Sequence, residues 1–332
     1  MHMPSLLSIQ DLEVSFRTED GDVTPVRGVT LSVAPGETVA LVGESGSGKS
    51  VTSLAIMGLL PRFTGRVSGG RILFRQRSGT IADLSALPLP ELRKLRGAEI
   101  AMVFQEPMTS LNPVLTIGEQ IAEPIRLHMG LGHAAALKRA EEMLDLVEIP
   151  DARRRVREYP HQMSGGMRQR VMIALAMSCN PSLLIADEPT TALDVTIQAQ
   201  ILALIQRLQR EVGMGVLFIT HNLGVVAEIA DRVTVMYAGQ VVETGTVGEI
   251  FRTPRHPYTS ALLNCLPARA RRGADGRRLV QSIPGSIGRV QDGCAFAPRC
   301  DRAVGPCRLG AVALETEMDR SVRCLRWREI AA

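Results

Sequence analysis

The segment GESGSGKS, residues 43–50, has the G-x-x-x-x-G-K-[ST] spacing of a phosphate-binding loop. Its glycines let the backbone turn tightly enough for amide N–H groups to surround phosphate oxygens. Lys49 supplies a cation to the outer phosphates, and the Ser50 hydroxyl can bind Mg²⁺. The loop lies between an apolar strand pattern and a helical one, as this motif requires. The predicted nucleotide-binding residues of this loop are Gly43, Ser45, Gly46, Gly48, Lys49 and Ser50.

An acid pair at the end of LLIADE, residues 183–188, is the second group that could do chemistry. The short, fully apolar run before it is typical of a buried parallel strand. Such a strand carries Asp187 and Glu188 to the carboxyl edge of the sheet, where ligands bind in open α/β folds. We expect Asp187 to contribute to the Mg²⁺ shell and Glu188 to polarise an attacking water. His221 follows another apolar strand pattern, GVLFIT, and is predicted at the same edge.

The segment MSGGMRQR, residues 163–170, predicts a second place where an anion can bind. Ser164, Gly165 and Gly166 precede a helical pattern and form an N-cap with free backbone N–H groups. A protein with one phosphate loop needs a second phosphate cradle only if that cradle serves another molecule's nucleotide. The segment therefore predicts a dimer with composite sites.

The elements that must position these residues alternate between strand and helix. Short strands are expected within residues 6–43, at 71–74 and at 100–104, and a helix from Lys49 to Leu60. Residues 114–180 are helical in period, with no convincing strand. A buried strand, a helix ending near Gly213, a second buried strand and a hairpin turning at Ala238-Gly239 follow. This alternation predicts an α/β fold with a parallel apolar core.

Composition limits the classes of protein. The chain has 332 residues, 45% hydrophobic and 22% charged, enough for two domains. With neither a long apolar run nor a signal-peptide pattern, we expect a soluble cytosolic protein. A net charge of +4 and 3% aromatic residues are poor material for binding single-stranded nucleic acid, so no nucleic-acid partner is predicted.

In their order along the chain, GESGSGKS, Gln105, MSGGM, LLIADE, ALD and THN resemble the nucleotide-binding domain of ABC transporters, over roughly residues 5–250. The resemblance implies a P-loop NTPase fold with an antiparallel β subdomain and a helical subdomain. It implies that Gln105 contacts Mg²⁺ and relays to a membrane subunit, and that Ser164 and Gly166 bind the γ-phosphate across the dimer. Met163 and Met167 stand where the family more often has Leu and Gln, which leaves the serine hydroxyl and glycine amides in place.

The same resemblance gives roles to three further residues. Asp194 matches the D-loop aspartate, and His221 matches the switch histidine that contacts the γ-phosphate. Phe16 is similar to the aromatic residue that stacks on adenine. ATP and Mg²⁺ are therefore the implied ligands, and ATP hydrolysis is the implied reaction.

The tail carries a narrower resemblance. RHPYT at residues 255–259, with ALLNCLP, IPGS and GCAFAPRC after it and EPMTSLNP after Gln105, is similar to ATP-binding subunits of dipeptide and oligopeptide importers. This implies a peripheral protein at the cytoplasmic face of the membrane. Its implied partners are a second ABC ATPase subunit, identical or paralogous, two permease subunits and an extracytoplasmic peptide-binding protein. The alternatives are an importer of nickel or glutathione or, from another class, a soluble ABC ATPase acting on nucleic acid or the ribosome.

We expect a nucleotide-binding domain over residues 1–250, with its helical subdomain at about 114–180, and a carboxy-terminal extension over residues 251–332. Residues 252–278 contain seven arginines and one acid, which is more often a solvated loop or linker than a contact with anionic lipid.

Four of the six cysteines lie in the last forty residues, spaced C-x5-C-x6-C-x16-C. A reducing compartment disfavours disulfides, and zinc sites prefer close C-x2-4-C pairs. Cluster ligands tolerate more varied spacing, and seven arginines against four acids in residues 294–328 are expected to lower the thiol pKa values. The importer resemblance implies a 4Fe-4S cluster, and buried structural thiols are the alternative. The predicted ligands are Cys294, Cys300, Cys307 and Cys324, while Cys179 and Cys265 are interpreted as packing residues.

Overall fold

The protein forms two compact units in its computed structural model, each assembled from separate stretches of chain. The structure describes residues 5–106, 110–191, 193–269, 271–272, 278–279, 282–286 and 292–330. Unit 1 comprises Met1–Ser8, Ser32–Glu37 and Leu73–Phe218, and unit 2 comprises Ile9–Leu31, Thr38–Ile72 and Ile219–Ala332. None of the helices in the described residues has the length and apolar character needed to cross a membrane.

Unit 1 contains a buried parallel pair of strands that carries the acid pair. β6 (Ile100–Val103) and β7 (Leu183–Asp187) run parallel with Ile100 opposite Leu183, and β8 (Gly215–Thr220) follows β7 in the sheet. Every residue of β7 is buried, as its apolar run predicts. The carboxyl end of this pair is therefore the end at which Asp187 and Glu188 emerge.

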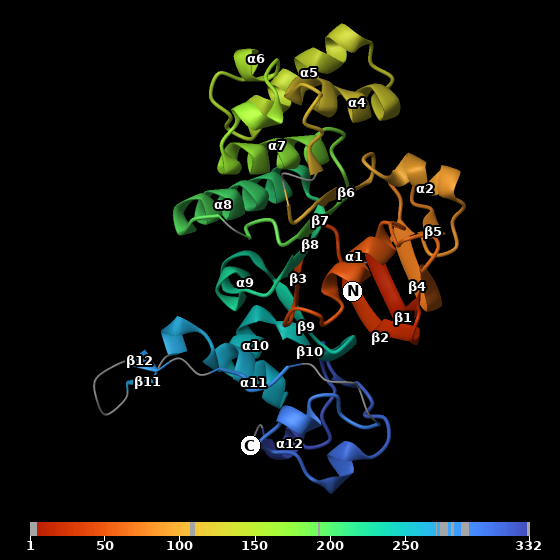
Figure 1. Cartoon of the computed structure of the whole chain (residues 1–332), viewed down its shortest axis with the longest axis vertical. Helices are drawn as coiled ribbons and strands as arrows, with labels where there is room; N and C mark the ends of the chain where they lie inside the picture. The colour runs from red at the N-terminus through yellow and green to blue at the C-terminus, as the bar shows by residue number, and fades with distance from the viewer. Residues whose placement is uncertain are drawn as a thin grey trace. The chain divides into compact units, whose positions relative to one another are not determined.

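The helices within residues 117–177 lie together beyond these strands in unit 1 (Figure 1). In residues 114–180, every regular element that the structure describes is helical. In the 195–212 helix, Ile201, Leu204, Ile205 and Leu208 are buried, whereas Val212 at its end is exposed. The helix ends at Gly213 with φ 70°, as predicted. The helices described in unit 1 are α2 (Leu89–Leu95), α4 (Ile117–Met129), α5 (His133–Leu146), α6 (Ala152–Arg155), η1 (Pro160–Gln162), α7 (Gly165–Met177) and α8 (Val195–Val212).

An antiparallel layer occupies the amino-terminal part of the chain. β1 (Leu7–Thr18) lies between β2 (Gly21–Val33) and β4 (Gly65–Arg75). The end of β4 pairs with β5 (Ile81–Asp83), with Leu73 opposite Asp83. Glu19 and Asp20 form the turn between β1 and β2.

In unit 2, a run of paired strands leads from the phosphate loop to the tail. β3 (Thr38–Val42) runs parallel to β9 (Arg232–Tyr237), which forms a hairpin with β10 (Gln240–Thr246). The hairpin turns at Ala238 and Gly239, both left-handed with φ of 47° and 82°. On its other edge β10 pairs with β14 (Arg320–Val322), which in turn pairs with β13 (Glu315–Glu317).

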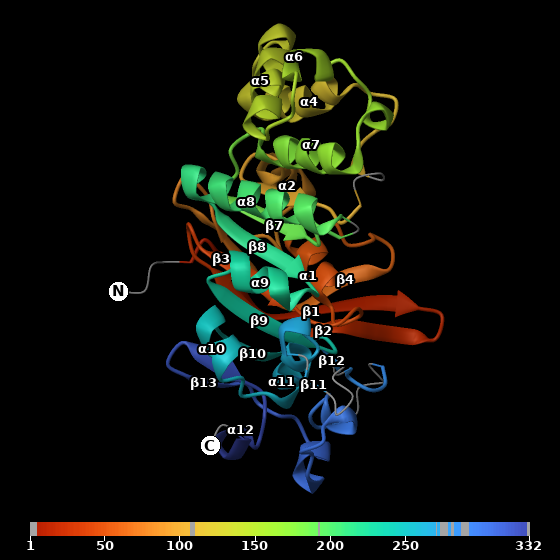
Figure 2. The ribbon, with the colours of Figure 1, turned by 90° about the vertical axis from the view of Figure 1, so that its left-hand side faces the viewer.

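Short helices cover this part of unit 2, with α10 beside β10 (Figure 2). The helix predicted to reach Leu60 ends at Ile56, because Gly58 adopts a left-handed φ of 59° that an α-helix cannot continue through. The remaining elements are α1 (Lys49–Ile56), α9 (Leu223–Ile229), α10 (Val247–Arg252), α11 (Pro257–Asn264), η2 (Pro267–Arg269), β11 (Arg271–Arg272), β12 (Arg278–Leu279), η3 (Ala297–Arg299), η4 (Gly305–Arg308) and α12 (Trp327–Ile330).

Residues on both sides of the predicted boundary at 250 lie in unit 2, since β14 extends the β9–β10 hairpin. The division into a nucleotide-binding domain and an extension stays a prediction. Most of the arginine-rich run after residue 269, Ala192 of the ALD motif and residues 107–109 of EPMTSLNP lie outside the described residues.

Candidate nucleotide site and cysteine lobe

The phosphate loop of unit 2 is packed so closely that two of its glycines have no room for a side chain. A Cβ at Gly43 would lie 2.2 Å from the Met236 carbonyl oxygen and 2.7 Å from the Ser47 Oγ. Gly48 adopts φ 99°, and a Cβ there would lie 2.5 Å from the Pro25 carbonyl oxygen. The sequence folds into this loop because only glycine fits both the space and the backbone angle.

Lys49 brings a positive charge into the loop. Its side chain is buried, and Nζ donates hydrogen bonds to the carbonyl oxygens of Gly43 at 2.8 Å and Glu44 at 3.0 Å. Ser45 and Gly46 of the loop and Ser50 in the first turn of α1 are exposed. Cation, helix N-terminus and accessible loop residues together can accept a polyphosphate.

In unit 1 the structure brings Gln105 and Glu188 together. The Gln105 Nε2 donates to Glu188 Oε2 at 3.1 Å, and the Thr191 hydroxyl donates to the same oxygen at 3.0 Å. Glu188 has a left-handed φ of 46°, which is uncommon for a residue with a side chain and typical of functional sites. Asp187 beside it is 5% exposed. Thr191 was not predicted; its position three residues after Glu188, within the turn that follows the strand, is the signal that was available.

The predicted second anion cradle lies at two neighbouring helix starts. Ser164 caps α7 as predicted, with Oγ accepting from the Met167 N–H at 3.4 Å. Asp194 caps α8 by accepting from the Ile197 N–H at 3.0 Å. A Cβ at Gly166 would lie 3.0 Å from Ile197 Cγ2, so the two helix starts touch through this glycine. Nothing lies within 4 Å of a Cβ built on Gly165, which leaves that side of α7 open.

His221 and Phe16 belong to unit 2. His221 is exposed directly after β8, and Asn222 beside it caps α9. Phe16 is half-buried on β1, and its ring lies against Gly65 of β4, where a Cβ would be 2.9 Å from Phe16 Cε1. Its role in adenine stacking stays a prediction.

The four predicted cysteine ligands converge in the cysteine lobe, which we define as residues 292–330. The Cys294 N–H donates to the Cys307 carbonyl at 2.8 Å, which closes the lobe's backbone on itself. Gly293 permits this approach, since a Cβ there would lie 2.6 Å from the same oxygen. All four cysteines line one small pocket together with His256, Phe296 and Leu325.

The expectation that arginines lower the thiol pKa values is wrong for three of these cysteines. Burial raises the pKa of Cys294 and Cys300, and it raises that of Cys324 to about 11. The free-energy cost of removing a thiolate from water is larger here than its attraction to the arginines, because most of these arginines form ion pairs with carboxylates. The lobe's arginine–carboxylate pairs are Arg299–Glu44, Arg320–Glu243, Arg326–Glu329 and Arg328–Glu315.

His256 contributes an unsatisfied donor to the same pocket. Its Nδ1 accepts from the Tyr258 N–H at 3.0 Å, which places the proton of the neutral ring on Nε2. Among the described residues Nε2 is buried without a hydrogen-bond partner, and burial lowers the His256 pKa to about 3. The Arg323 carbonyl is near enough to oppose this shift but not in hydrogen-bond geometry with Nε2.

Comparisons with known proteins decide the family. Residues 26–191 match the family model described as "ABC transporter". A putative peptide import ATP-binding protein of Brucella melitensis is 56% identical over 339 residues, with both chains fully covered. The chain belongs to the ABC transporter family. The predicted family, P-loop ABC fold and class of enzyme, an ABC-type ATPase, are therefore confirmed.

Two further comparisons describe this ABC ATPase. Residues 242–307 match the model "Oligopeptide/dipeptide transporter, C-terminal region". The glutathione import ATP-binding protein GsiA of Salmonella typhimurium is 59% identical over 262 residues, covering 79% of this chain and 42% of that one.

Among solved structures, the ATP-binding cassette MJ0796 bound to ADP and Pi is similar with a TM-score of 0.63 and 30% identity. This match covers 73% of this ABC ATPase and 98% of MJ0796. The cbiO1 protein from Clostridium perfringens, part of the ABC transporter complex cbiONQ, gives a TM-score of 0.60 at 28% identity. That match covers 74% of this chain and 90% of cbiO1.

Proposed function

We propose that this ABC ATPase powers the import of dipeptides or oligopeptides across the cytoplasmic membrane. The observation that carries the proposal is full-length identity of 56% to a putative peptide import ATP-binding protein. The match of residues 242–307 to the oligopeptide/dipeptide transporter region supports the same cargo. The proposed partners are a second ABC ATPase subunit, two permease subunits and an extracytoplasmic peptide-binding protein. The chain would then work as a peripheral protein at the cytoplasmic face.

The phosphate loop is the proposed site of ATP binding. Gly43, Ser45, Gly46, Gly48, Lys49 and Ser50 would surround the phosphates with N–H groups and one ammonium. Ser50, Gln105 and Asp187 offer the oxygen ligands that Mg²⁺ prefers, and the ion would neutralise charge on the phosphates. Lys49→Ala is expected to weaken ATP binding at least about tenfold, since it removes that cation. Titration of the purified chain with a fluorescent ATP analogue measures this, and unchanged affinity contradicts the assignment.

Glu188 is the proposed base that polarises the attacking water. Two hydrogen bonds on Oε2, from Gln105 and Thr191, fix the orientation of its carboxylate. The carboxylate so oriented is proposed to polarise the water. His221 is proposed to contact the γ-phosphate, and Phe16 to stack on adenine.

The starts of α7 and α8 are the proposed contact with a second ATPase subunit. Ser164, Gly165 and Gly166 would bind the γ-phosphate held by the partner, and Asp194 would lie at the same interface. The open side of Gly165 and the touching helix starts support this arrangement. ATP binding would then close the dimer, which drives the permeases.

Glutathione is the second candidate cargo, supported by the 59% identity to GsiA. Uptake of a labelled tripeptide into cells, challenged with excess unlabelled glutathione or excess tripeptide, separates the two. Competition by both at similar concentrations favours glutathione-like cargo, and competition by tripeptide alone favours general peptides.

The class of partner is tested by purification from detergent-solubilised membranes. An importer subunit is expected to co-purify with two permeases. Stable association with ribosomes or DNA, and none with membranes, contradicts the proposal.

The cysteine lobe is the proposed site of a 4Fe-4S cluster on Cys294, Cys300, Cys307 and Cys324. Two observations support the fit: the four thiols line one pocket, and His256, whose Nε2 has no hydrogen-bond partner among the described residues, lines the same pocket. A cluster would supply thiolate and sulfide acceptors for this donor. Within the described part of the chain, no three His, Cys, Asp or Glu side chains are grouped closely enough for a single metal ion. A single tetrahedral ion holds its thiolates about 3.8 Å apart, given metal–sulfur bonds of about 2.3 Å, whereas a cluster spreads them more widely.

Iron and acid-labile sulfide analysis of anaerobically purified protein tests the cluster. The wild type is expected to contain about four of each per chain, following the cluster's stoichiometry. Cys294→Ser is expected to lose them, and the matched control Cys179→Ser to keep them. An iron-free wild type returns the four residues to the alternative of buried structural thiols.

A further inference from the structure

Glu44, the second residue of the phosphate loop, is held at all three of its polar groups. Its N–H donates to the Tyr258 hydroxyl at 2.9 Å, and its carbonyl accepts from Lys49 Nζ at 3.0 Å. Its carboxylate accepts a bidentate pair from Arg299, with Nη1 at 2.7 Å and Nη2 at 3.1 Å. Two of these three partners come from the tail, more than 200 positions away in the sequence.

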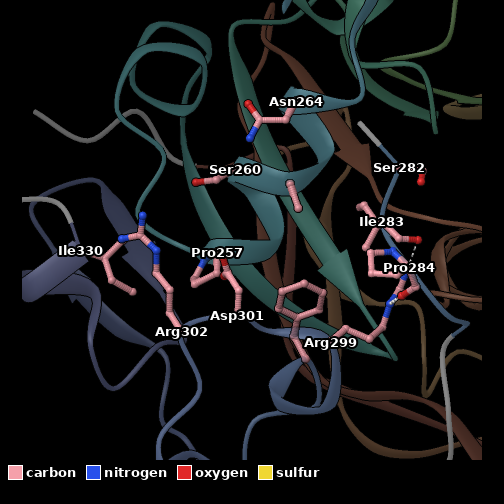
Figure 3. Close-up of a pocket in the computed structure, with 12 residues that line it drawn as sticks. Pro257, Ser260, Asn264, Ser282, Ile283, Pro284, Arg299, Asp301, Arg302 and Ile330 are labelled. Carbon is pink, nitrogen blue, oxygen red and sulfur yellow. Dashed lines mark hydrogen bonds between the residues drawn. The ribbon is translucent and has the colours of Figure 1, made fainter. Parts of the chain in front are cut away.

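Arg299 cannot easily turn away from the loop. Its side chain is 7% exposed, and Nε donates to the Pro284 carbonyl at 2.8 Å. Nη2 also donates to the Ile283 carbonyl at 3.2 Å, and Nη1 to the Tyr237 hydroxyl at 3.3 Å. Figure 3 shows the side chain turned toward Ile283 and Pro284, at the wall of a pocket of about 280 Å³. With so many fixed acceptors, the guanidinium is oriented before any ligand arrives.

An aromatic cluster packs around Tyr258 and Arg299, the two partners of Glu44 that come from the tail. The rings of Tyr237 and Tyr258 lie 4.6 Å apart, and the ring of Phe296 lies 5.3 Å from each. Tyr258 is fully buried, and burial raises its pKa, so its hydroxyl stays protonated while it accepts from the Glu44 N–H. The cluster belongs to α11, β9 and the cysteine lobe, so the tail is packed as a support for the loop.

The charge of Glu44 explains why such a support is needed. A carboxylate in a loop that receives a polyphosphate repels its ligand, and the repulsion is strong where water is partly excluded. The Arg299 guanidinium neutralises this carboxylate and at the same time fixes its direction. The Glu44 carbonyl then stays in place for Lys49, the cation that the loop offers to phosphate.

We propose that Arg299 and Tyr258 are positioning residues of the nucleotide site, which act through Glu44 so that the carboxy-terminal tail sets the affinity for ATP. The inference rests on the proposed function, because it assumes that this loop binds ATP. It adds two residues outside the nucleotide motifs to the machinery that controls the loop.

Titration of the purified full chain with a fluorescent ATP analogue tests the proposal. Arg299→Gln is expected to raise the Kd about tenfold, because it leaves the Glu44 carboxylate unneutralised. Arg299→Lys is expected to stay within about threefold of wild type, since it keeps the charge. Tyr258→Phe, which removes only a hydroxyl, is expected to raise the Kd about threefold.

Rescue distinguishes positioning from general support of the fold. The double variant Glu44→Gln/Arg299→Gln is expected to recover to within about threefold of wild type, because the repelling charge is gone. Arg320→Gln is the matched control, since Arg320 is an equally buried tail arginine whose carboxylate partner is Glu243 rather than Glu44. Arg328→Gln, whose side chain is exposed, serves if that control does not fold.

Equal loss of affinity in Arg299→Gln and the controls overturns the proposal, as does unchanged affinity in Arg299→Gln or no recovery in the double variant. Lys49→Ala separates this failure from failure of the proposed function. If Lys49→Ala loses ATP while Arg299→Gln keeps it, the loop binds nucleotide without help from the tail. If the wild type binds no ATP, both proposals fail.

Discussion

The side-chain amide of Gln105 donates a hydrogen bond of 3.1 Å to the Glu188 carboxylate, across 83 positions of sequence. It places the residue expected to relay to the membrane subunit in direct contact with the proposed catalytic base. A movement of the loop around Gln105 would therefore change the orientation of the Glu188 carboxylate. The contact gives a physical route by which a partner at that loop could control hydrolysis.

Glu188→Gln is expected to lower ATP hydrolysis at least about 100-fold, because an amide cannot take a proton from water. ATP affinity is expected to stay within about twofold of wild type, since the Glu188 side chain is proposed to contact the attacking water and not the phosphates. Phosphate release and nucleotide titration measure the two quantities. Glu211→Gln, an exposed acid on α8, is the matched control. Hydrolysis at the wild-type rate in Glu188→Gln would show that the base is another group.

Ser164→Ala is expected to weaken ATP-driven dimerisation while the monomer still binds ATP. The variant also removes a helix cap, which costs about 1 kcal/mol of stability. Thr116→Ala is the matched control, because Thr116 caps α4 in the same way, accepting from the Glu119 N–H at 3.3 Å. Light scattering in the presence of ATP measures the dimer, with Glu188→Gln added to each cap variant. Equal dimerisation in the two cap variants contradicts the composite site.

Alkylation of Cys324 by iodoacetamide is expected to accelerate about tenfold per pH unit up to about pH 11, in reduced chain free of iron. The reason is that only the thiolate reacts and burial raises the Cys324 pKa to about 11. Mass spectrometry of the peptide containing Cys324 follows the rate, with the urea-unfolded chain as reference. A rate that already levels off near pH 8.5 in the folded chain would show an unshifted thiol.

His256 is expected to make the cysteine lobe less stable in acid. Its folded pKa of about 3 lies below the ordinary value of 6.5, so the unfolded chain binds the proton first as the pH falls. Stability is therefore lost from about pH 6.5 downward, by about 2 kcal/mol at pH 5. His256→Asn, which can still accept from the Tyr258 N–H, should show a shallower loss between pH 7 and 5. Urea unfolding followed by Trp327, the single tryptophan and a residue of the lobe, measures it. The same pH dependence in both proteins would contradict the assignment.

Local patterns were sufficient to predict the elements that carry the motifs. The apolar run of β7, the cap at Ser164 and the hairpin turn at Ala238-Gly239 all depend on residues within a few positions of each other. The capping box of α10, with Thr246 and Glu249, was an equally local signal that was missed.

Contacts between distant segments could not be predicted in this way. The pairing of β14 with β10 and the hold of Arg299 on Glu44 join positions that no periodicity relates. The thiol pKa values were predicted in the wrong direction for a similar reason. A count of arginines in the sequence does not show that most of them pair with carboxylates, nor that the thiols are withdrawn from water.

Uptake of a labelled tripeptide by cells tests the central claim most directly, when the chain's gene is replaced by its Glu188→Gln form at matched protein level. Uptake is expected to fall to the level of a gene deletion, while the wild-type gene restores it. Undiminished uptake with Glu188→Gln, in cells whose purified variant no longer hydrolyses ATP, would show that this ATPase does not power peptide import.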